Sequence, residues 1–406
     1  MKFALLDPDD DALALTAALL RSGNDELTVF DTTDDAALAQ LEALAPSTDR
    51  TTEWENVLAG SNDFVLVGTA GPAERRFEQL RRLVLENVAV VFVHPFSLQT
   101  LEYHELDMNR QATNTAIVPY SPLRLRLAAS HIESLGRPGR TSIAADSLLV
   151  HGIGRLEQIT IERQARVRSR SAALRHFVRD VGLVLRAVGP CNKVSALGKL
   201  GDSEHGDAPT DGGHLGVQIT TDDDVLVRWS IGTIVDRVGA RVTLIGSQGN
   251  AVLSMPDDAD WSLLIRRGDD SETIPYDRDD ALPTDALADL TKAAAGPSDD
   301  KLWREALADL ELVEAVERSM RRGRTVELYH EEASEQGTFH GVMSAVGCGL
   351  LMLSIGLAIL ASMVGWLKLR IANLWPYALL AILVVFLLMQ FLKFVFPSEQ
   401  RGPSQE

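Results

Sequence analysis

Two long uncharged runs near the C-terminus constrain this chain more than any other feature of its sequence. They extend from Gly341 to Leu367 and from Leu374 to Leu392, and neither contains a charged side chain. A helix crosses the hydrocarbon core of a bilayer with about 20 apolar residues, so each run is long enough to span a membrane. Trp375, Tyr377 and Lys393, at the ends of the second run, are residue types that favour the water boundary of a span. The sequence therefore predicts a pair of transmembrane helices.

The predicted spans cover residues 341–367 and 374–396, and residues 331–340 link them to the body of the chain. A buried helical hairpin inside a large globular core is the alternative, and two successive uncharged runs of this length disfavour it. Small residues recur at every fourth position of the first span: Gly341, Ala345 and Gly349. Such residues let helix backbones approach closely, either for packing against the second span or for association of copies into a homo-oligomer.

The N-terminal residues set the expected orientation. An acid, Asp7, follows the first apolar residues too early for a secretory signal peptide. We therefore expect an integral membrane protein, bound to the lipid bilayer through the hairpin, whose soluble body faces the cytoplasm. Lys368 and Arg370, in the short loop between the spans, oppose this orientation under the positive-inside tendency. Two charges beside a folded domain rarely decide topology, so we give the missing signal peptide more weight.

Charge, cysteine content and missing motifs exclude several functions. The formal net charge is −18, so nucleic acid is a poor partner. Cys191 and Cys348 lie in different contexts, the second within a predicted span, so they supply neither a disulfide framework nor a thiolate metal site. The chain contains neither a Gly-x-Ser-x-Gly elbow nor a phosphate-binding P-loop, so hydrolase and P-loop ATPase functions have no support.

The first 120 residues alternate between strand-like and helix-like segments. Strand-like apolar runs lie at 2–6, 26–30, 63–67, 88–93 and 115–120, with helix-forming stretches such as 11–20 and 73–86 between them. A run that is apolar throughout, such as Val88–Val93, is typical of a parallel strand covered on both faces. The alternation predicts the α/β class, with a doubly wound, Rossmann-like parallel sheet.

The pattern changes after about residue 137. A helix over 171–188 precedes closely spaced strands at 193–197, 215–220, 225–231, 240–246, 250–255 and 262–266. The segments Thr221–Asp224 and Ser247–Gly249 have the composition of hairpin turns. We expect an α+β second domain with an open antiparallel sheet, a helix on one face and a closing helix over 301–322.

Several local runs carry a resemblance to a known family. They are Trp54–Leu58 with Asp63–Val67, Val90–Pro95 with Ser97–Leu106, Gly152–Leu156, Gly246–Asn250 and Ala315–Glu327. With the predicted order of domains, these runs resemble the Gfo/Idh/MocA family, which includes glucose–fructose oxidoreductase and inositol dehydrogenase. The resemblance covers about residues 1–330 and implies a nucleotide-binding-type domain at 1–125 and a dehydrogenase-like domain at 126–330.

The resemblance also implies a cofactor and a substrate class. The cofactor would be NAD or NADP, and the substrate a sugar, polyol or sugar derivative. The matching cofactor-binding positions are Asp7, Asp31, Thr69 and Pro95. Asp31 ends the second strand where an acid accepts ribose hydroxyls in dinucleotide folds, although Asp also ends strands for turn reasons.

The turn after the first strand departs from the family pattern. A dinucleotide fold holds the pyrophosphate on a Gly-rich turn at a helix N-terminus, whereas this turn, Asp7–Asp11, has no glycine. Its carboxylates would cap the helix and repel phosphates, at a cost of about 1 to 4 kcal/mol for like charges ~4 Å apart. Three interpretations stay open: an acidic cap on an emptied site, a dinucleotide held in another way, and a metal that bridges phosphate to the carboxylates.

The catalytic positions depart from the pattern as well. His94 precedes the proline where the family has a lysine that contacts the reacting hydroxyl. A histidine can transfer protons near neutral pH, but His94 could equally be a strand-end residue bonded to backbone. The family's catalytic Asp and His positions fall on Arg175 and Arg179, and His176 and Asp180 lie beside them, turned by ~100° on a helix. A shift of one residue in the match to the family would bring His176 and Asp180 into the catalytic positions. The catalytic candidates are therefore His94, His176 and Asp180.

Two further groups of residues are candidates for binding an anion or a metal ion. A basic run contains Arg163, Arg166, Arg168, Arg170, Arg175, Arg179 and Arg186. It could bind a small anionic ligand or lipid head groups, or it could be a solvated face paired with the acidic N-terminal domain. The loop Lys199–His214 contains His205, Asp207, Asp211 and His214, but their spacing fits no metal site, and we expect no metal.

Two functions therefore stay open. The first is a membrane-anchored, NAD(P)-dependent oxidoreductase of the Gfo/Idh/MocA type. The second is a catalytically inactive relative that acts as a membrane-tethered ligand-binding or scaffold protein.

Overall fold

The computed structural model describes most of the body of the chain. The described residues are 1–59, 62–136, 148, 152–200, 213–235, 237–277, 284–296 and 300–328, and they belong to a compact unit that extends from Met1 to Tyr329. Within these ranges, no helix combines the length and the apolar character needed to cross a membrane. The predicted spans and their linker lie outside the described residues, so the membrane hairpin stays a prediction.

The N-terminal part of the body builds a parallel sheet. Its strands are β1 (Lys2–Leu6), β2 (Glu26–Asp31), β3 (Asp49–Arg50), β4 (Phe64–Val67), β5 (Val90–Val93) and β6 (Ile117–Tyr120), in the order β3-β2-β1-β4-β5-β6. Each neighbouring pair is parallel. The strand order reverses between β1 and β4, and ligands of doubly wound sheets bind beyond the carboxyl ends of the strands at such a point. The predicted doubly wound, Rossmann-like sheet is confirmed.

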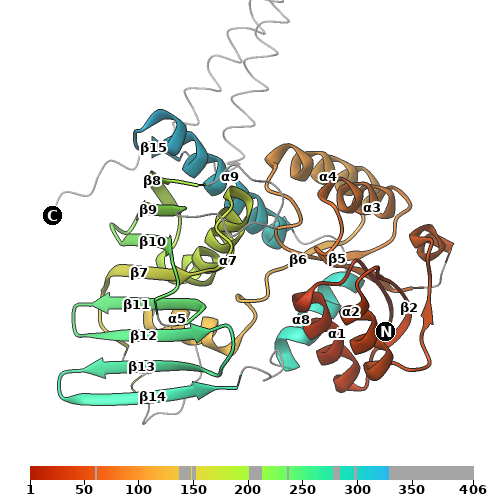
Figure 1. Ribbon diagram of the computed structural model, residues 1–406, viewed down its shortest axis with the longest axis horizontal. Coiled ribbons are helices and arrows are strands. Elements are labelled where there is room, and N and C mark those ends of the chain that lie inside the picture. The colour runs from red at the N-terminus through yellow and green to blue at the C-terminus, as the bar shows by residue number, and fades with distance from the viewer. Residues whose placement is uncertain are drawn as a thin grey trace, which may run out of the picture. The chain divides into compact units, whose positions relative to one another are not determined.

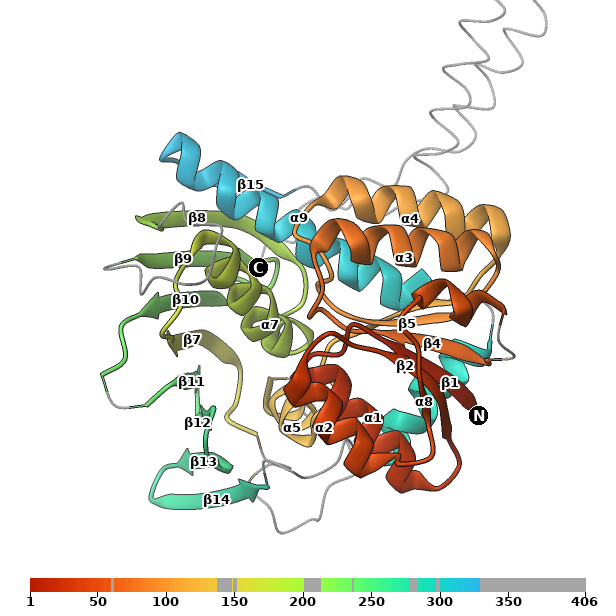
Figure 2. The same ribbon diagram turned by 45° about the vertical axis from the view of Figure 1, so that its right-hand side comes forward.

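Helices cover both faces of this sheet (Figure 1 and Figure 2). One face carries α1 (Asp10–Ser22), α2 (Asp35–Leu44) and α8 (Thr284–Ala295), and the other carries α3 (Ala73–Leu85), α4 (Thr100–Thr113) and the start of α9 (Asp300–Arg322). A short 3-10 helix, η1 (Trp54–Ala59), precedes β4. Along β1, Phe3 and Leu5 join one core, and Ala4 and Leu6 join the other. This double coverage explains why the strands are apolar throughout.

Two helices from the C-terminal part of the body return to the first sheet. Leu287 and Leu290 of α8 pack in the core that contains Phe3. Trp303 of α9 packs in the opposite core, with its ring 6.2 Å from that of Phe92. Both helices contact edge strand β6, α8 from one face of the sheet and α9 from the other. The predicted 126–330 domain therefore contributes two helices to the first domain.

The second sheet is larger and open on one face. Its strands are β7 (Leu156–Gln164), β8 (Cys191–Lys199), β9 (His214–Thr221), β10 (Leu226–Gly232), β11 (Gly239–Gly246), β12 (Gly249–Pro256), β13 (Trp261–Arg267), β14 (Asp270–Tyr276) and β15 (Val326–Glu327). The order is β14-β13-β12-β11-β7-β10-β9-β8-β15. The core lies on the face covered by α5 (Leu127–Gly136), α7 (Arg170–Val188) and the end of α9 (Figure 1).

This second sheet is mixed, so the prediction of an antiparallel sheet is wrong at one pair of strands. Strand β10 pairs with β7 in parallel, from Leu226 opposite Gln158 to Gly232 opposite Gln164. The reason is the crossover: α7 carries the chain back after β7, so β8 restarts in the direction of β7, and two hairpin reversals leave β10 in that same direction. The prediction also lacked β14, whose largely exposed residues give no clear apolar alternation.

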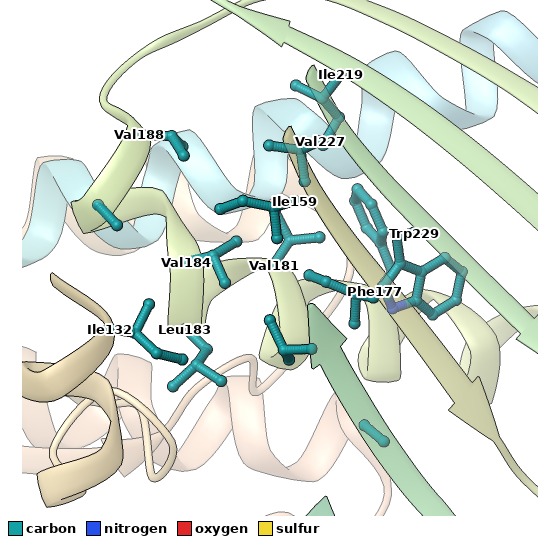
Figure 3. Packing of buried hydrophobic residues seen from close by; sticks show 14 of the residues in the cluster. Ile132, Ile159, Phe177, Val181, Leu183, Val184, Val188, Ile219, Val227 and Trp229 are labelled. Atoms are coloured by element: carbon teal, nitrogen blue, oxygen red, sulfur yellow. The ribbon is translucent and has the colours of Figure 1, made fainter. Parts of the chain in front are cut away.

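The packing of α7 against the second sheet determines which of its residues face the second core. Phe177, Val181 and Val184, spaced by four and three residues, pack against Ile159 of β7 and Trp229 of β10 (Figure 3). The rings of Phe177 and Trp229 meet edge to face, with centroids 5.3 Å apart. Residues spaced in this way share one face of a helix, so the sheet and the core fix the rotation of α7.

Candidate functional site

The turn between β1 and α1 is filled by its own side chains. Asp9 is the N-cap of α1 and accepts a hydrogen bond from the Ala12 backbone N–H at 2.8 Å. Its second carboxylate oxygen accepts hydrogen bonds from the Thr69 backbone N–H, at 3.2 Å, and from the Thr69 hydroxyl. Asp9 thus joins the start of α1 to the loop after β4. Thr69, a predicted cofactor-binding residue, donates to a carboxylate of the chain itself.

The two other predicted acidic cofactor residues share one arginine. Asp7 and Asp31 are 3% and 4% exposed. Arg75 donates to the Asp31 carboxylate at 2.5 Å, and its Nε lies 3.3 Å from the Asp7 carboxylate as an ion pair. Gln79 also donates to Asp7, at 3.0 Å. Burial raises the pKa of Asp31, against the opposing pull of Arg75. Asp31 therefore has a strong donor where a ribose would need to bind.

Close packing of the loop after β4 leaves little room beside this turn. A Cβ atom on Gly68 would lie 2.3 Å from the Asp7 carbonyl oxygen, and one on Gly71 would lie 2.8 Å from the Asp7 carboxylate. Glycines are therefore required at Gly68 and Gly71 by the chain's own acidic turn. In dinucleotide folds, glycines in the β1–α1 turn instead let the backbone approach the pyrophosphate. The residues present at this turn do not fit the phosphates of NAD or NADP.

His94 lies in a buried polar network. It is 3% exposed, with Nδ1 2.9 Å from the Tyr103 hydroxyl and Nε2 3.1 Å from the Asp309 carboxylate. Arg124 donates to the other oxygen of Asp309 at 2.6 Å. Burial lowers the pKa of His94, although the hydrogen bond to Asp309 opposes the shift. His94 is thus bonded at both ring nitrogens to groups from α4 and α9.

The cavity beside His94 is too small for a substrate. His94, Arg124, Arg179 and Asp309 line it, and its volume is about 10 Å³. A single water needs roughly 10 to 15 Å³ by the same measure. Pro95, the remaining predicted cofactor-binding residue, is buried next to His94. Among the described residues, the structure therefore gives His94 no space for a sugar.

Asp180 faces the core of the second domain. It is fully buried and accepts hydrogen bonds from Arg163 of β7, including one from Nε at 3.0 Å, and from the Trp229 indole N–H at 3.0 Å. Its position three residues after Phe177 places it on the core face of α7. His176 is partly buried, and burial together with the charge of Arg163 lowers its pKa to about 4. His94 and Asp180 bond to different elements and share no hydrogen-bond partner.

Arg179 occupies the position that the family resemblance assigns to a catalytic residue. It forms an ion pair with Asp11 of α1 at 2.8 Å, and so connects the two domains across the end of the first sheet. Burial raises the pKa of Asp11, and Arg179 opposes that shift. Arg175, one turn earlier on α7, is exposed. The position that would face a substrate is therefore taken by an arginine that pairs with the acidic turn.

Only part of the basic run pairs with the N-terminal domain. Arg179 does so through Asp11, whereas Arg163 binds Asp180, and Arg170 and Arg186 bind Glu317 and Glu305 of α9. The interpretation of a face paired with the acidic domain is thus correct for Arg179 among these four. Three of the four candidate metal ligands in the loop Lys199–His214, namely His205, Asp207 and Asp211, lie outside the described residues, and His214 begins β9. Within the described ranges, no cluster of side chains could hold a metal ion.

Sequence reasoning did not predict the residues that bind the candidate acids and His94. Arg75 and Gln79 lie on α3, and the resemblance pointed only to the acids that they bind. Asp309 lies 215 residues after His94, so no local spacing could have linked them. A detectable signal was present for Arg75, because a helix with four arginines follows an N-terminal segment that is rich in acids. Its partners still required the tertiary structure.

Solved structures of similar fold provide the comparison with known proteins. No family model and no curated protein matches this chain. An oxidoreductase from Agrobacterium radiobacter, in complex with NAD+, L-tartaric acid and magnesium, is 13% identical, with a TM-score of 0.62, and the match covers 80% of this chain and 98% of that one. A myo-inositol dehydrogenase from Corynebacterium glutamicum is 16% identical, with a TM-score of 0.58 and coverages of 81% and 99%.

A third structure carries a sugar nucleotide. The WlbA dehydrogenase from Chromobacterium violaceum, in complex with NADH and UDP-GlcNAcA, is 18% identical, with a TM-score of 0.57 and coverages of 82% and 96%. These likenesses establish that the body has the fold of Gfo/Idh/MocA-type oxidoreductases. The structural part of the predicted resemblance is confirmed. Two of these structures contain NAD+ or NADH, which agrees with the cofactor that the resemblance implies for this fold.

Proposed function

We propose that this chain is a catalytically inactive protein of the oxidoreductase fold that acts as a membrane-tethered ligand-binding or scaffold protein. The closed turn between β1 and α1 carries the proposal. Asp9 caps α1 where a pyrophosphate would bind, and Arg75 neutralises Asp7 and Asp31. A dinucleotide would have to displace these contacts and place its phosphates beside several carboxylates.

The surroundings of the catalytic candidates support the same proposal. Hydride transfer from a hydroxyl compound, or to the corresponding carbonyl compound, needs a group that takes up or gives up a proton at the substrate. His94 is bonded to Tyr103 and Asp309 and is buried. Asp180 is a fully buried partner of Arg163 and Trp229. His94 and Asp180 are thus both bonded to partners within the fold, which they stabilise.

The tether rests on the two uncharged runs at 341–367 and 374–396. The small residues of the first run would allow close packing between helices of different copies, and so a homo-oligomer. In this arrangement the body is held at the membrane surface, where it would present a ligand site or a surface for partner proteins.

A second candidate function is NAD(P)-dependent oxidation or reduction of a sugar or polyol. One observation favours it: the body has the fold of structures that contain NAD+ or NADH, with Asp31 at the end of β2, where an acid binds ribose in such folds. It requires that Arg75 release Asp31 and that the acidic turn open.

A titration with reduced dinucleotides separates the two candidates. The full-length chain, reconstituted in phosphatidylcholine nanodiscs, is titrated with NADH and with NADPH while nicotinamide fluorescence is recorded against empty discs. We expect no saturable change up to about 1 mM of either compound. A dissociation constant below that value for either one would overturn the proposal.

A matched pair of variants identifies the site if binding does occur. Asp31→Ala removes the residue at the ribose position, and Asp10→Ala removes an exposed acid of the same region. Weaker binding in the first variant and unchanged binding in the second would establish the dinucleotide candidate. Equal binding in both would place the cofactor outside this turn.

A further inference from the structure

A cavity beside edge strand β6 lies apart from the acidic turn. Its volume is about 520 Å³, within the range of roughly 300 to 1,000 Å³ that small-molecule sites occupy. Its walls come from β6, α8, α9 and the segment around Arg124. Both helices contact β6, α8 from one face of the first sheet and α9 from the other, so the cavity lies at the edge of that sheet.

The inner wall of this cavity is apolar. It is lined by Val118, Pro119, Leu290, Ala293, Leu302 and Ala306. Pro119 has no backbone N–H and interrupts the donors of the edge strand, and such a strand is a poor template for an added strand. The shape and the lining therefore favour a compact apolar group over an extended peptide.

Most of the charged residues that line the cavity are basic, in a chain whose net charge is −18. Four basic residues line it, Arg124, Arg186, Lys292 and Lys301, against two acids, Asp289 and Glu305. Arg186 and Arg124 share the Glu305 carboxylate, at 3.2 Å and 3.8 Å. Lys292 is exposed and forms no ion pair with the described residues. An excess of positive charge beside an apolar wall suits an anionic group on an apolar body.

We propose that this cavity binds a soluble amphipathic acid, with its apolar body between α8 and α9 and its anionic group at Lys292 and Arg186. The site does not depend on the state of the dinucleotide turn, so it would exist under either candidate function. Arg124 lines both this cavity and the small space beside His94, and it donates to Asp309. A bound acid would thus contact the network that holds His94.

The test compares an aromatic acid with its neutral analogue. The full-length chain in phosphatidylcholine nanodiscs is titrated with 1-naphthoate and with 1-naphthamide by calorimetry, with empty discs as the blank. We expect saturable binding of the acid that is about 10-fold tighter than binding of the amide, because the amide lacks the charge that Lys292 would bind. Equal affinities, or no binding of the acid at millimolar concentration, would overturn the proposal.

Three variants locate the binding. Lys292→Gln should weaken naphthoate binding about 5- to 10-fold, whereas Lys199→Gln, which removes an exposed lysine of β8, should change it less than about twofold. Ala293→Phe places a ring in the cavity and should abolish the heat of binding. Equal effects of the two lysine variants would overturn the proposed position, and the exposure of both lysines keeps this comparison independent of folding.

A change of lipid distinguishes a soluble ligand from a membrane lipid. The titration is repeated in nanodiscs that contain phosphatidylglycerol. Unchanged naphthoate binding supports a soluble acid. Loss of binding would show that an anionic lipid occupies the cavity and would overturn the choice of a soluble ligand. Neither result depends on NADH binding, so this test and the dinucleotide titration can fail separately.

Discussion

His176 and Asp180 lie four residues apart on α7 and have different surroundings. Asp180 is fully buried between Arg163 and Trp229, whereas His176 is only partly buried. Arg175, next to His176, points to solvent. At the scale of single residues, the rotation of α7 thus decides which candidate stabilises the core and which stays near the surface.

Asp180→Ala is expected to destabilise the body by about 3 to 5 kcal/mol, because it leaves the Arg163 guanidinium buried without its carboxylate. The measurement is equilibrium urea unfolding of the purified chain, followed by circular dichroism. Arg175→Ala, on the same helix, should change the free energy of unfolding by no more than about 0.5 kcal/mol. Similar losses in both variants would contradict a structural role that is specific to Asp180.

The partly buried imidazole of His176 should make stability depend on pH. Burial lowers its pKa to about 4 in the folded protein, from an ordinary value of 6.5. The unfolded chain therefore binds a proton as pH falls through 6.5 while the folded chain does not, so stability decreases from about pH 6.5 down to about pH 4. Urea midpoints measured across this window should fall less steeply for His176→Gln than for the wild type.

Exposed His104 of α4 provides the control for this experiment. His104→Gln should keep the pH dependence of the wild type, because it leaves the partly buried imidazole of His176 in place. If His176→Gln retained the full wild-type slope, the lowered pKa of His176 would be wrong.

The elements of the first sheet are held together at their ends by one arginine of α3. Arg76 is 4% exposed and donates to the carbonyl oxygens of Thr69, at 2.8 Å, and of Phe96, at 2.7 and 3.1 Å. It also donates to the carbonyl of Gly71. Burial lowers the pKa of Arg76, and the charge of Arg175 adds to that shift. The loops after β4 and β5 are thus fixed by a single guanidinium.

Arg76→Lys should destabilise the body by about 1 to 3 kcal/mol, because an ammonium group cannot reach three carbonyls in the geometry of the fork. Arg81→Lys is the matched variant on the same helix, where a largely exposed ion pair with Glu78 is involved. It should change stability by at most about 0.5 kcal/mol. Thermal unfolding of the two variants side by side gives the comparison, and equal melting temperatures would refute the role of Arg76.

At the scale of the whole body, ion pairs connect the first domain to the second. Arg179 of α7 binds Asp11 of α1, and Arg124 binds Asp309 of α9. Two further helices, α8 and α9, return to the first sheet from the C-terminal part of the chain. Of these contacts, the Arg179–Asp11 ion pair lies beyond the carboxyl end of β1, where doubly wound sheets bind their ligands.

Membrane attachment is a prediction for the full chain. It should remain in the membrane fraction after an alkaline carbonate wash, because two spans of about 20 apolar residues hold a protein far more tightly than surface charge does. Deletion of residues 341–396 should release the protein into the supernatant, and deletion of residues 401–406 should not. Recovery of the intact chain in the supernatant would refute the predicted hairpin.

The sequence by itself determined the class of the first domain and the acidic character of the turn after its first strand. Strands that are apolar throughout, with helices between them, can be buried only in a parallel sheet covered on both faces. The missing glycines and the carboxylates from Asp7 to Asp11 are visible in the sequence, and their capping role depends on residues close in the chain.

Only the tertiary structure decided which partners those residues find. Arg75 reaches Asp31 across 44 residues, Arg179 reaches Asp11 from another domain, and Asp309 reaches His94 across 215. Local propensity and spacing carry no information on such contacts, because they depend on how strands and helices pack. For the same reason the parallel pair β7–β10 and the return of α8 to the first sheet escaped prediction.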